Sequence, residues 1–236
     1  MIRTLIVLGA LLGLAGCAGN PPMQQDAAEG LRAGTVAVAF AYPEKRIQYD
    51  ELVYKVLWNE MRSSTASFDG IWDIDGDLSD QFARQFRVEG LRAVPLGEVL
   101  DGATYAQFTD TMSAYHPRME GAKLSVSEAV RAALLDKDID YLIAMRAANL
   151  HVQAFSLGVN PHATLSYQMN VIDLKRNEIV YATHMFLATS PEVGKSAREI
   201  EDNGLAKLRA GLSESLRLSF EKDVVPKQLG MVAASQ

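Results

Sequence analysis

Aspartates alternate with other residues in the run DIDGDL, which places Asp73, Asp75 and Asp77 at every second position. Oxygen ligands at this spacing begin the twelve-residue loop of helix–loop–helix calcium sites. That loop also needs a glycine at its sixth position for a sharp turn and a glutamate at its twelfth to bind the ion. The sequence has Leu78 and Arg84 at these two positions, and the positive charge of Arg84 opposes calcium.

A helix that starts beside these aspartates explains them without an ion. Leu78 begins an apolar helical repeat that extends to Val88, and Asp77 precedes it at the N-cap position. Asp80 then falls in the first turn, where the helix dipole favours a negative charge. We therefore predict a solvated helix start, capped by Asp77, and no metal site. Weak calcium binding by the three alternating aspartates is the alternative.

The segment PEVGKS, residues 191–196, carries Gly-Lys-Ser between a predicted strand and a predicted helix. A phosphate-binding loop has this setting, but it needs a further glycine where this chain has Thr189. Glu192 would also repel a phosphate. The pattern instead indicates a capping box, with Ser196 as the N-cap and Glu199 three residues later.

The four histidines are His116, His151, His162 and His184. His151 and His162 flank a predicted turn, so their side chains could converge on a metal. The chain lacks the HExxH and His-x-His spacings that many zinc sites show. It also lacks the Gly-x-Ser-x-Gly pattern of a nucleophilic serine. We predict no catalytic residue, no cofactor site and no metal site.

The only cysteine, Cys17, closes a segment typical of a secretory signal. Arg3 supplies its basic start, and the apolar run LIVLGALLGL that follows is shorter than the about 20 residues that span a bilayer. The last four residues, LAGC, resemble the bacterial lipobox, which has an apolar residue, two small residues and a cysteine. The resemblance implies that residues 1–16 are a signal peptide and that the Cys17 thiol receives a diacylglycerol.

Lipidated proteins of this kind are held in the inner membrane by an aspartate directly after the cysteine. Here Ala18 follows Cys17, so the resemblance implies the outer membrane, with the folded part facing the periplasm; exposure at the cell surface stays open. Several acyl chains, each contributing about 0.8 kcal/mol per buried CH₂, would anchor the chain firmly. Residues 17–33 are rich in proline, glutamine and alanine at their start, and we predict a lipidated tether there.

The remaining composition is that of an ordinary globular domain. The chain has 236 residues, 48% of them hydrophobic, and a formal net charge of −6. Its positive charges are scattered, which argues against a nucleic-acid partner. One cysteine excludes an intrachain disulfide. We predict a single domain over residues 34–226 and a flexible tail over residues 227–236, since Pro226 should block the preceding helix.

The hydrophobic periodicity predicts a fold of mixed α/β (α+β) class. The early elements alternate between strand and helix, which favours parallel pairs, and three strands then follow in succession. The connector Lys175-Arg176-Asn177 marks a hairpin between the last two. We expect a mixed sheet with a C-terminal antiparallel meander, helices packed on it and a long C-terminal helix. Strands are predicted at 35–40, 68–74, 91–96, 141–155, 163–174 and 178–188, and helices at 50–61, 78–88, 97–108, 129–137 and 196–222.

This order of elements behind a lipobox resembles a loose family of periplasmic α/β lipoproteins. The family includes the curli secretion lipoprotein, the lipoprotein activators of peptidoglycan synthases, the Pel-type polysaccharide secretion lipoprotein and the N-terminal domain of the Tol translocation protein. The matching features are the first strand at Thr35–Phe40, the helix and strand at Gln81–Leu96, and the run from Asp140 into the hairpin. The resemblance is one of pattern, over roughly residues 35–220.

The resemblance implies a non-catalytic scaffold or accessory subunit of a cell-envelope assembly or secretion machine. Its partners would be the outer membrane, through the lipid, and envelope proteins or further copies of the same chain. A second hypothesis is a lipoprotein that binds a lipid, glycan or metal in a pocket beside the sheet, and it predicts an apolar cavity of several hundred Å³. A third is an envelope hydrolase, which predicts clustered carboxylates or histidines in a cleft.

Overall fold

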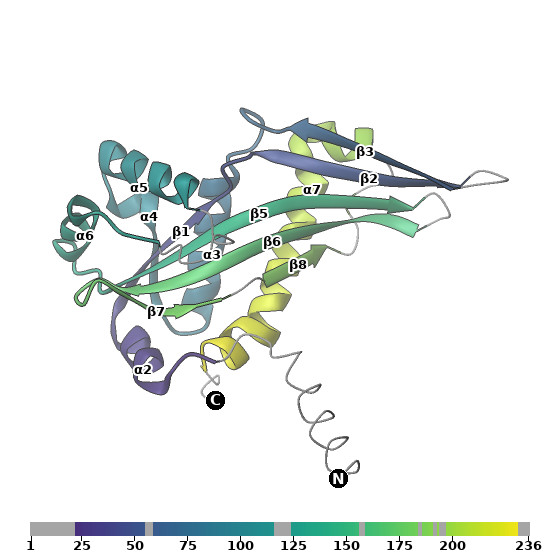
Figure 1. Cartoon of the computed structure of the whole chain (residues 1–236). Helices are drawn as coiled ribbons and strands as arrows, with labels where there is room; N and C mark the ends of the chain where they lie inside the picture. Colours follow the sequence, from purple (N-terminus) through teal and green to yellow (C-terminus); the bar gives the residue numbers. More distant parts are fainter. Residues whose placement is uncertain are drawn as a thin grey trace, which may run out of the picture.

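A computed structural model describes residues 22–54, 59–115, 124–155, 159–183, 186–190, 193 and 197–230. Within this part of the chain an eight-stranded mixed sheet carries helices on its faces, which confirms the predicted fold class (Figure 1). The strands are β1 (Thr35–Ala41), β2 (Arg46–Tyr54), β3 (Asn59–Ser67), β4 (Arg92–Pro95), β5 (Tyr141–Phe155), β6 (Val159–Asp173), β7 (Glu178–Ala182) and β8 (Phe186–Ser190). The helices are α2 (Gln25–Ala33), α3 (Ile74–Val88), α4 (Leu96–Val99), α5 (Gly102–Ala114), α6 (Glu128–Leu135), α7 (Ala197–Ser219) and the π-helix η2 (Phe220–Gln228).

The long strands β5 and β6 form an antiparallel hairpin that organises the whole sheet. The first part of β5 pairs in parallel with β1, and its last part pairs in parallel with β2. On the other side, β6 pairs first with β8 and then with β7, both antiparallel, as the predicted meander requires. The sheet therefore has a basal half, which contains β4, β1 and β7, and a distal half, which contains β3, β2 and β8.

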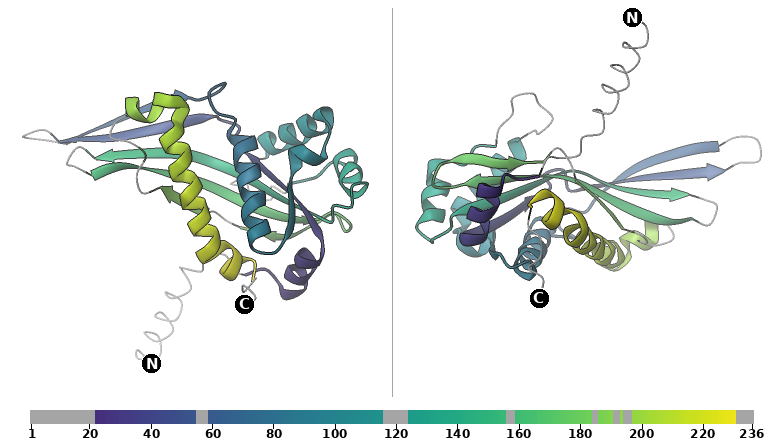
Figure 2. Two further views of the ribbon diagram at one scale, coloured as in Figure 1. Left: turned by 180° about the vertical axis from the view of Figure 1, so that it is seen from behind. Right: turned by 90° about the horizontal axis from the view of Figure 1, so that it is seen from below.

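The two faces of the sheet are covered differently. The back face packs against α3 and α7, which cross behind the strands in Figure 1 and in front of them in the left view of Figure 2. The front face of the basal half packs against α4, α5 and α6 in a second cluster that includes Leu142, Ile172 and Phe108. No described helix covers the front face of the distal half (Figure 1).

Aromatic side chains join the helices to the back face. The Phe82 ring of α3 lies 5.8 Å from Phe40, 5.5 Å from Tyr167 and 5.1 Å from Phe220, measured between centroids. All four rings are almost completely buried. Because they come from α3, β1, β6 and η2, this one cluster holds the layers of the back side together.

The region predicted as a helix at 50–61 is the hairpin of β2 and β3, so that prediction is wrong. Ile47 and Tyr49 are buried while Gln48 between them is exposed, which is the alternation of a strand. Pairing of β2 with both β5 and β3 outweighs the helical spacing of its apolar residues. The strand predicted at 68–74 is also wrong: a turn at 69–71, across which the Trp72 N–H donates to the Phe68 carbonyl at 3.1 Å, leads into α3, which begins at Ile74.

The predicted tether includes a packed helix, α2, that the sequence reading missed. Met23, Ala28 and Leu31 are buried against the core, and Leu31 has no exposed surface. The glycine in the middle of α2 is required because a Cβ on Gly30 would lie 2.3 Å from the Tyr141 hydroxyl oxygen. Packed structure therefore begins near Met23 and not at residue 34.

The long C-terminal helix is confirmed, but it does not stop at Pro226. The chain continues as η2, in which Val224 and Val225 are buried, and Leu229 beyond it has no exposed surface. Burial of these three side chains compensates for the N–H group that proline lacks. The strand predicted at 178–188 is divided into β7 and β8, both paired with β6. Among the described residues, no helix combines the length and the apolar character that crossing a membrane requires.

Candidate interaction surfaces

The aspartates that could have bound calcium are held by separate protein donors. Asp73, not Asp77, is the N-cap of α3, and it accepts from the Gly76 N–H at 3.2 Å. The predicted cap was one turn late because the buried face of α3 begins before Leu78. Asp77 instead accepts from the indole N–H of Trp72 at 2.7 Å and pairs with Arg209 of α7 at 2.5 Å.

The third aspartate, Asp75, fastens α3 to the end of β1. Its Oδ1 accepts from the Tyr42 N–H at 2.7 Å, and burial raises the pKa of this carboxyl. One turn further on, the Ser79 hydroxyl accepts from the Phe40 N–H at 2.9 Å. The three aspartates thus serve the helix start and its docking. In the described part of the chain, no group of three or more His, Cys, Asp or Glu residues is arranged to hold a metal ion.

Polar side chains gather on the front face of the distal half, and we call this group the polar front patch. On the back face of the same strands lie buried residues such as Ile47, Leu150 and Val152, so the alternation along each strand places polar side chains in front. Register places these front residues in rows across the strands. The patch consists of Gln48, Asp50, Ser63, Thr65, His151, Gln153, His162, Thr164 and Thr189.

An ion pair links two strands within this patch. Asp50 Oδ2 lies 2.6 Å from His151 Nε2, and the two side chains are 19% and 21% exposed. A hydrogen bond from Ser63 is the main cause that lowers the pKa of Asp50, and the contact with His151 adds to it. Since Asp50 belongs to β2, His151 to β5 and Ser63 to β3, this group connects the β2–β3 hairpin to the centre of the sheet.

His162 lies on the same face of the same hairpin as His151, but each has its own partner. His162 Nε2 lies 3.1 Å from the Gln153 side-chain oxygen. The expectation that the two histidines could share a metal therefore has no support in this geometry. His116, His184 and the segment 194–196 lie outside the described residues, as does Cys17.

Arg146 marks the boundary between the covered and the open parts of the front face. It is 7% exposed, and its Nε donates to the Met112 carbonyl of α5 at 3.0 Å. Burial lowers the pKa of this guanidinium. Next along the chain, the front face changes from Leu142 and Ala144, which are apolar and covered, to Asn149 and His151.

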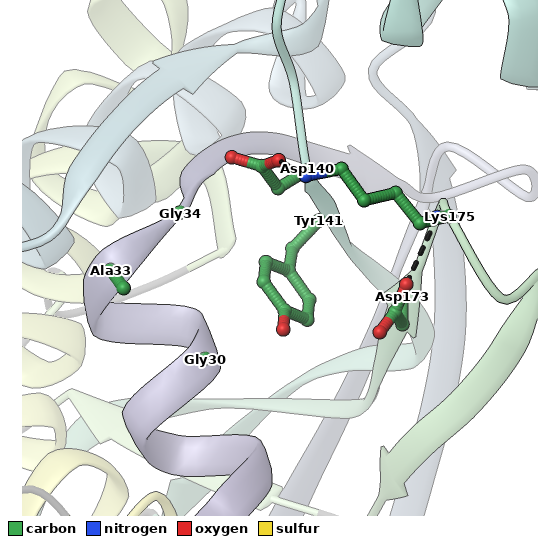
Figure 3. A pocket seen from close by; sticks show the side chains of 7 residues that line it. All are labelled: Gly30, Ala33, Gly34, Asp140, Tyr141, Asp173 and Lys175. Atoms are coloured by element: carbon green, nitrogen blue, oxygen red, sulfur yellow. Dashed lines mark hydrogen bonds and ion pairs between the residues drawn. The ribbon is translucent and has the colours of Figure 1, made fainter.

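A small pocket lies at the basal end, between α2 and the start of β5 (Figure 3). It measures about 250 Å³, and the Tyr141 ring points into it beside Gly30 and Gly34. Asp140 pairs with Lys175 at 2.6 Å and also accepts from the backbone N–H of Thr35 at 2.9 Å.

These contacts give the pocket a structural role. The hydrogen bond from Lys175 is the main cause that lowers the pKa of Asp140, and the Thr35 N–H contributes to the same effect. Asp173, which also lines the pocket, pairs with Arg176 at 3.2 Å. Both carboxylates therefore have protein partners, and the contacts of Asp140 hold the connection from α2 to β1 against the base of the sheet. A ligand would have to displace these contacts.

A larger hollow of about 700 Å³ opens beside β6 and β7. Its walls mix apolar side chains with polar ones, which are Ser125, Asn170, Asn177 and Glu178. The apolar walls are formed by Leu124, Val126, Ile172 and Ile179.

Comparisons with known proteins identify no family. No family model matches the chain, and no curated protein matches it. A hypothetical protein from Chlamydia trachomatis is similar in structure over 86% of this chain and 99% of its own, with 14% identity and a TM-score of 0.47.

Two further solved structures have a similar outline. The PelC dodecamer from Paraburkholderia phytofirmans covers 85% of this chain and 91% of its own, with 10% identity and a TM-score of 0.36. A lipoprotein from Neisseria meningitidis covers 80% and 99%, with 10% identity and a TM-score of 0.37. With TM-scores below 0.5 and identities of 10–14%, these similarities assign neither a family nor an activity to this chain.

Sequence reasoning missed the polar front patch because it assigned Asp50 to a helix. Two signals could have revealed it. The run RIQY before Asp50 alternates polar and apolar residues, and the run SSTAS at 63–67 is typical of a strand, not of a helix. Together they predict a hairpin with Asp50 on one strand, whereas the pairing of that strand with β5, which brings Asp50 beside His151, comes from the structure alone.

Proposed function

We propose that this chain is a lipoprotein anchored to the outer membrane through Cys17, with its folded part in the periplasm. It acts as a non-catalytic accessory subunit of an envelope assembly or secretion machine. The observation that supports this most is the position of its only cysteine, at the end of the LAGC lipobox and six residues before the packed Met23. An anchor at that point would hold the domain at the lipid surface.

The surface of the domain supports action through protein contacts. The polar front patch extends over five strands, and two pairs of its side chains bond across strands, Asp50 with His151 and His162 with Gln153. Such a surface suits a large partner better than a small molecule. Attachment to one membrane also raises the effective concentration of partners that share it.

Substitution of Cys17 tests the anchor. In Cys17→Ala the protein should leave the membrane fraction, or accumulate with its first sixteen residues uncleaved, and labelled fatty acid should no longer be incorporated. The matched control is Ser125→Ala, a change in the folded domain that keeps the lipobox. Incorporation of fatty acid into the Cys17→Ala protein would show that the lipobox interpretation is wrong.

Partner capture tests the accessory role. We expect chemical crosslinking in intact cells to give defined complexes with one or a few envelope proteins, and these complexes should be lost when residues of the polar front patch, such as Gln153 and Thr164, are changed to Lys. A Lys substitution at Asp136, an exposed residue beyond α6, is the control. Complexes that tolerate the changes in the patch would contradict this surface.

The hollow beside β7 favours a second candidate, a lipoprotein that binds a small amphipathic ligand. Apolar side chains such as Ile172 and Ile179 line it together with polar ones such as Asn170 and Glu178, which fits a molecule with an apolar body and a polar end. Ile179→Asp would place a charge in this wall. Binding of a fluorescent fatty acid that is abolished by Ile179→Asp would support this candidate function. If the unchanged chain does not bind the fatty acid, this candidate function is wrong.

A further inference from the structure

Strand β3 forms one edge of the described sheet. It has nine residues, each paired with a residue of β2 without interruption from Asn59 to Ser67. It stands at the end of the strand order, so its other side pairs with no described strand. Figure 1 shows it on the hairpin that projects from the body, away from α2.

The other edges of the sheet are protected in ways that β3 is not. β4 has four residues and ends in Pro95, and β7 has five residues and an irregular register. The third of these edge strands, β8, also has only five residues. Short strands, proline and irregularities are the features by which sheets avoid adding a further strand. β3 is longer, regular and free of proline and glycine, which makes it the edge best suited to strand addition.

The sequence of β3 is complementary to itself. In the run NEMRS, Glu60 and Arg62 stand on either side of Met61. Met61 is 58% exposed, and the side chains of Glu60 and Arg62 are 37% and 56% exposed. Within one chain Glu60 and Arg62 form a pair at 3.2 Å, so both lie on the same face, the one that carries Ala66 against the core.

We propose that β3 pairs antiparallel with β3 of a second copy of this chain, about a twofold axis through Met61. In this register Glu60 of each copy lies opposite Arg62 of the other, and the two Met61 side chains meet on the front face. Opposite charges in directly opposed positions stabilise an antiparallel pair, whereas like charges destabilise it. A shift by one residue would lose both charge pairs, so the register is specified.

This inference goes beyond the proposed function, because the pairing does not require the lipid anchor. The two polar front patches would join into one surface across the pair, since both lie on the same side of a continuous sheet. Anchored copies would pair more readily because they share a membrane.

A single introduced cysteine tests the register. In the full chain carrying Cys17→Ala, Met61→Cys is the only cysteine, and the proposed axis brings it directly opposite its copy. Opposed Cβ atoms in such a pair are about 5 Å apart, close enough for a disulfide after small adjustment. The purified protein in detergent should form a disulfide-linked dimer under mild oxidation.

Thr65→Cys in the same background is the matched control. It lies on the same face of the same strand, but its copy would be about 27 Å away along the pair, at about 3.4 Å for each of the intervening residues. A linked dimer from Met61→Cys alone supports the proposal. Linkage through Thr65→Cys instead, or in neither variant, overturns it, and neither result depends on whether Cys17 is lipidated.

Charge reversal provides an independent test. Glu60→Arg or Arg62→Glu alone replaces two attractive pairs with two repulsive ones, so each variant should dimerise about tenfold more weakly or worse. A mixture of the two variants should form the mixed dimer, and the double variant should dimerise as the unchanged chain does. Native mass spectrometry measures these species. Equal dimerisation of all variants, or a monomeric unchanged chain, would overturn the proposal.

Discussion

The two halves of the sheet share the strands β5 and β6 but differ in their front faces. In the basal half the front residues are apolar, such as Leu142 and Ala144, and helices cover them. In the distal half the front residues are polar, such as His151 and Gln153, and no described helix covers them. The same two strands therefore serve a core in one half and a surface in the other.

This difference indicates where stability and recognition are located. In the basal half, apolar side chains on both faces of the sheet are buried against helices and contribute to stability. The distal half keeps one apolar face against α7 and presents the other to its surroundings. Substitutions in the basal core and in the polar front patch should therefore have very different effects, and four measurements test this in order of decreasing size.

The largest effect is expected from Phe82→Ala. The ring is fully buried among Phe40, Tyr167 and Phe220, so its removal should lower the free energy of unfolding by about 3–5 kcal/mol. Urea denaturation measures the loss. Thr164→Ala in the polar front patch is the control and should stay within about 0.5 kcal/mol. Similar losses in both variants would remove the distinction between the two halves.

Leu31→Ala in α2 should follow, with a loss of about 2–4 kcal/mol. Leu31 has no exposed surface, so α2 belongs to the basal core and not to a tether. Ala27 on the same helix is only partly buried and gives the control, because Ala27→Ser should change little. An unfolding free energy unaffected by Leu31→Ala would return this segment to the tether that the sequence predicted.

Tyr42→Phe tests the junction between the halves. The Tyr42 hydroxyl donates to the Arg46 carbonyl at 2.6 Å and accepts from the Leu150 N–H at 3.1 Å. Its removal leaves buried backbone groups without a partner, which costs about 1–3 kcal/mol. Hydrogen exchange at Leu150 should become faster while exchange at Ile143, in the basal half, changes less. Uniform acceleration at both amides would show that the halves do not open separately.

The smallest effect concerns the pH dependence of Asp50. Its pKa is held below the ordinary 3.8, so its charge contributes stability that is present above that value and lost as the pH falls through the folded-state pKa. Asp50→Asn should therefore reduce the unfolding free energy by about 1 kcal/mol at pH 7. The difference from the unchanged chain should become smaller as the pH falls below 3.8. A difference in unfolding free energy that grows as the pH falls would contradict a stabilising role for the ionised Asp50 carboxylate.

The sequence predicted the elements whose local pattern and tertiary partners agree. β5, α3 and α7 have strong periodicity, and the connector at 175–177 has clear turn residues, so these predictions are confirmed. The sequence-based predictions were wrong where a tertiary contact with a distant segment determines the secondary structure. Residues 50–54 have a helical spacing of apolar side chains, yet pairing with β5 makes them a strand. The local sequence could not predict the docking of α2, because α2 packs against Tyr141, which is distant in the sequence.

The candidate surfaces were predictable only in part. The rejection of a standard calcium loop rested on Leu78 and Arg84, and the structure gives each nearby aspartate a protein partner. The pairing of Asp50 with His151 joins residues 101 positions apart, which no local pattern encodes. The self-complementary run in β3 was present in the sequence, but its meaning depends on β3 being an edge strand.

The packing of α2 has a consequence for height above a membrane. Only five residues separate Cys17 from Met23, so a lipid on Cys17 would keep the base of the fold within roughly 20 Å of the bilayer. β5 and β6 have 15 residues each and run away from that base, which gives a length of about 50 Å. If Cys17 is lipidated, the basal end of the sheet would lie near the bilayer, and the described distal ends of β5 and β6 could reach about 50 Å beyond that end.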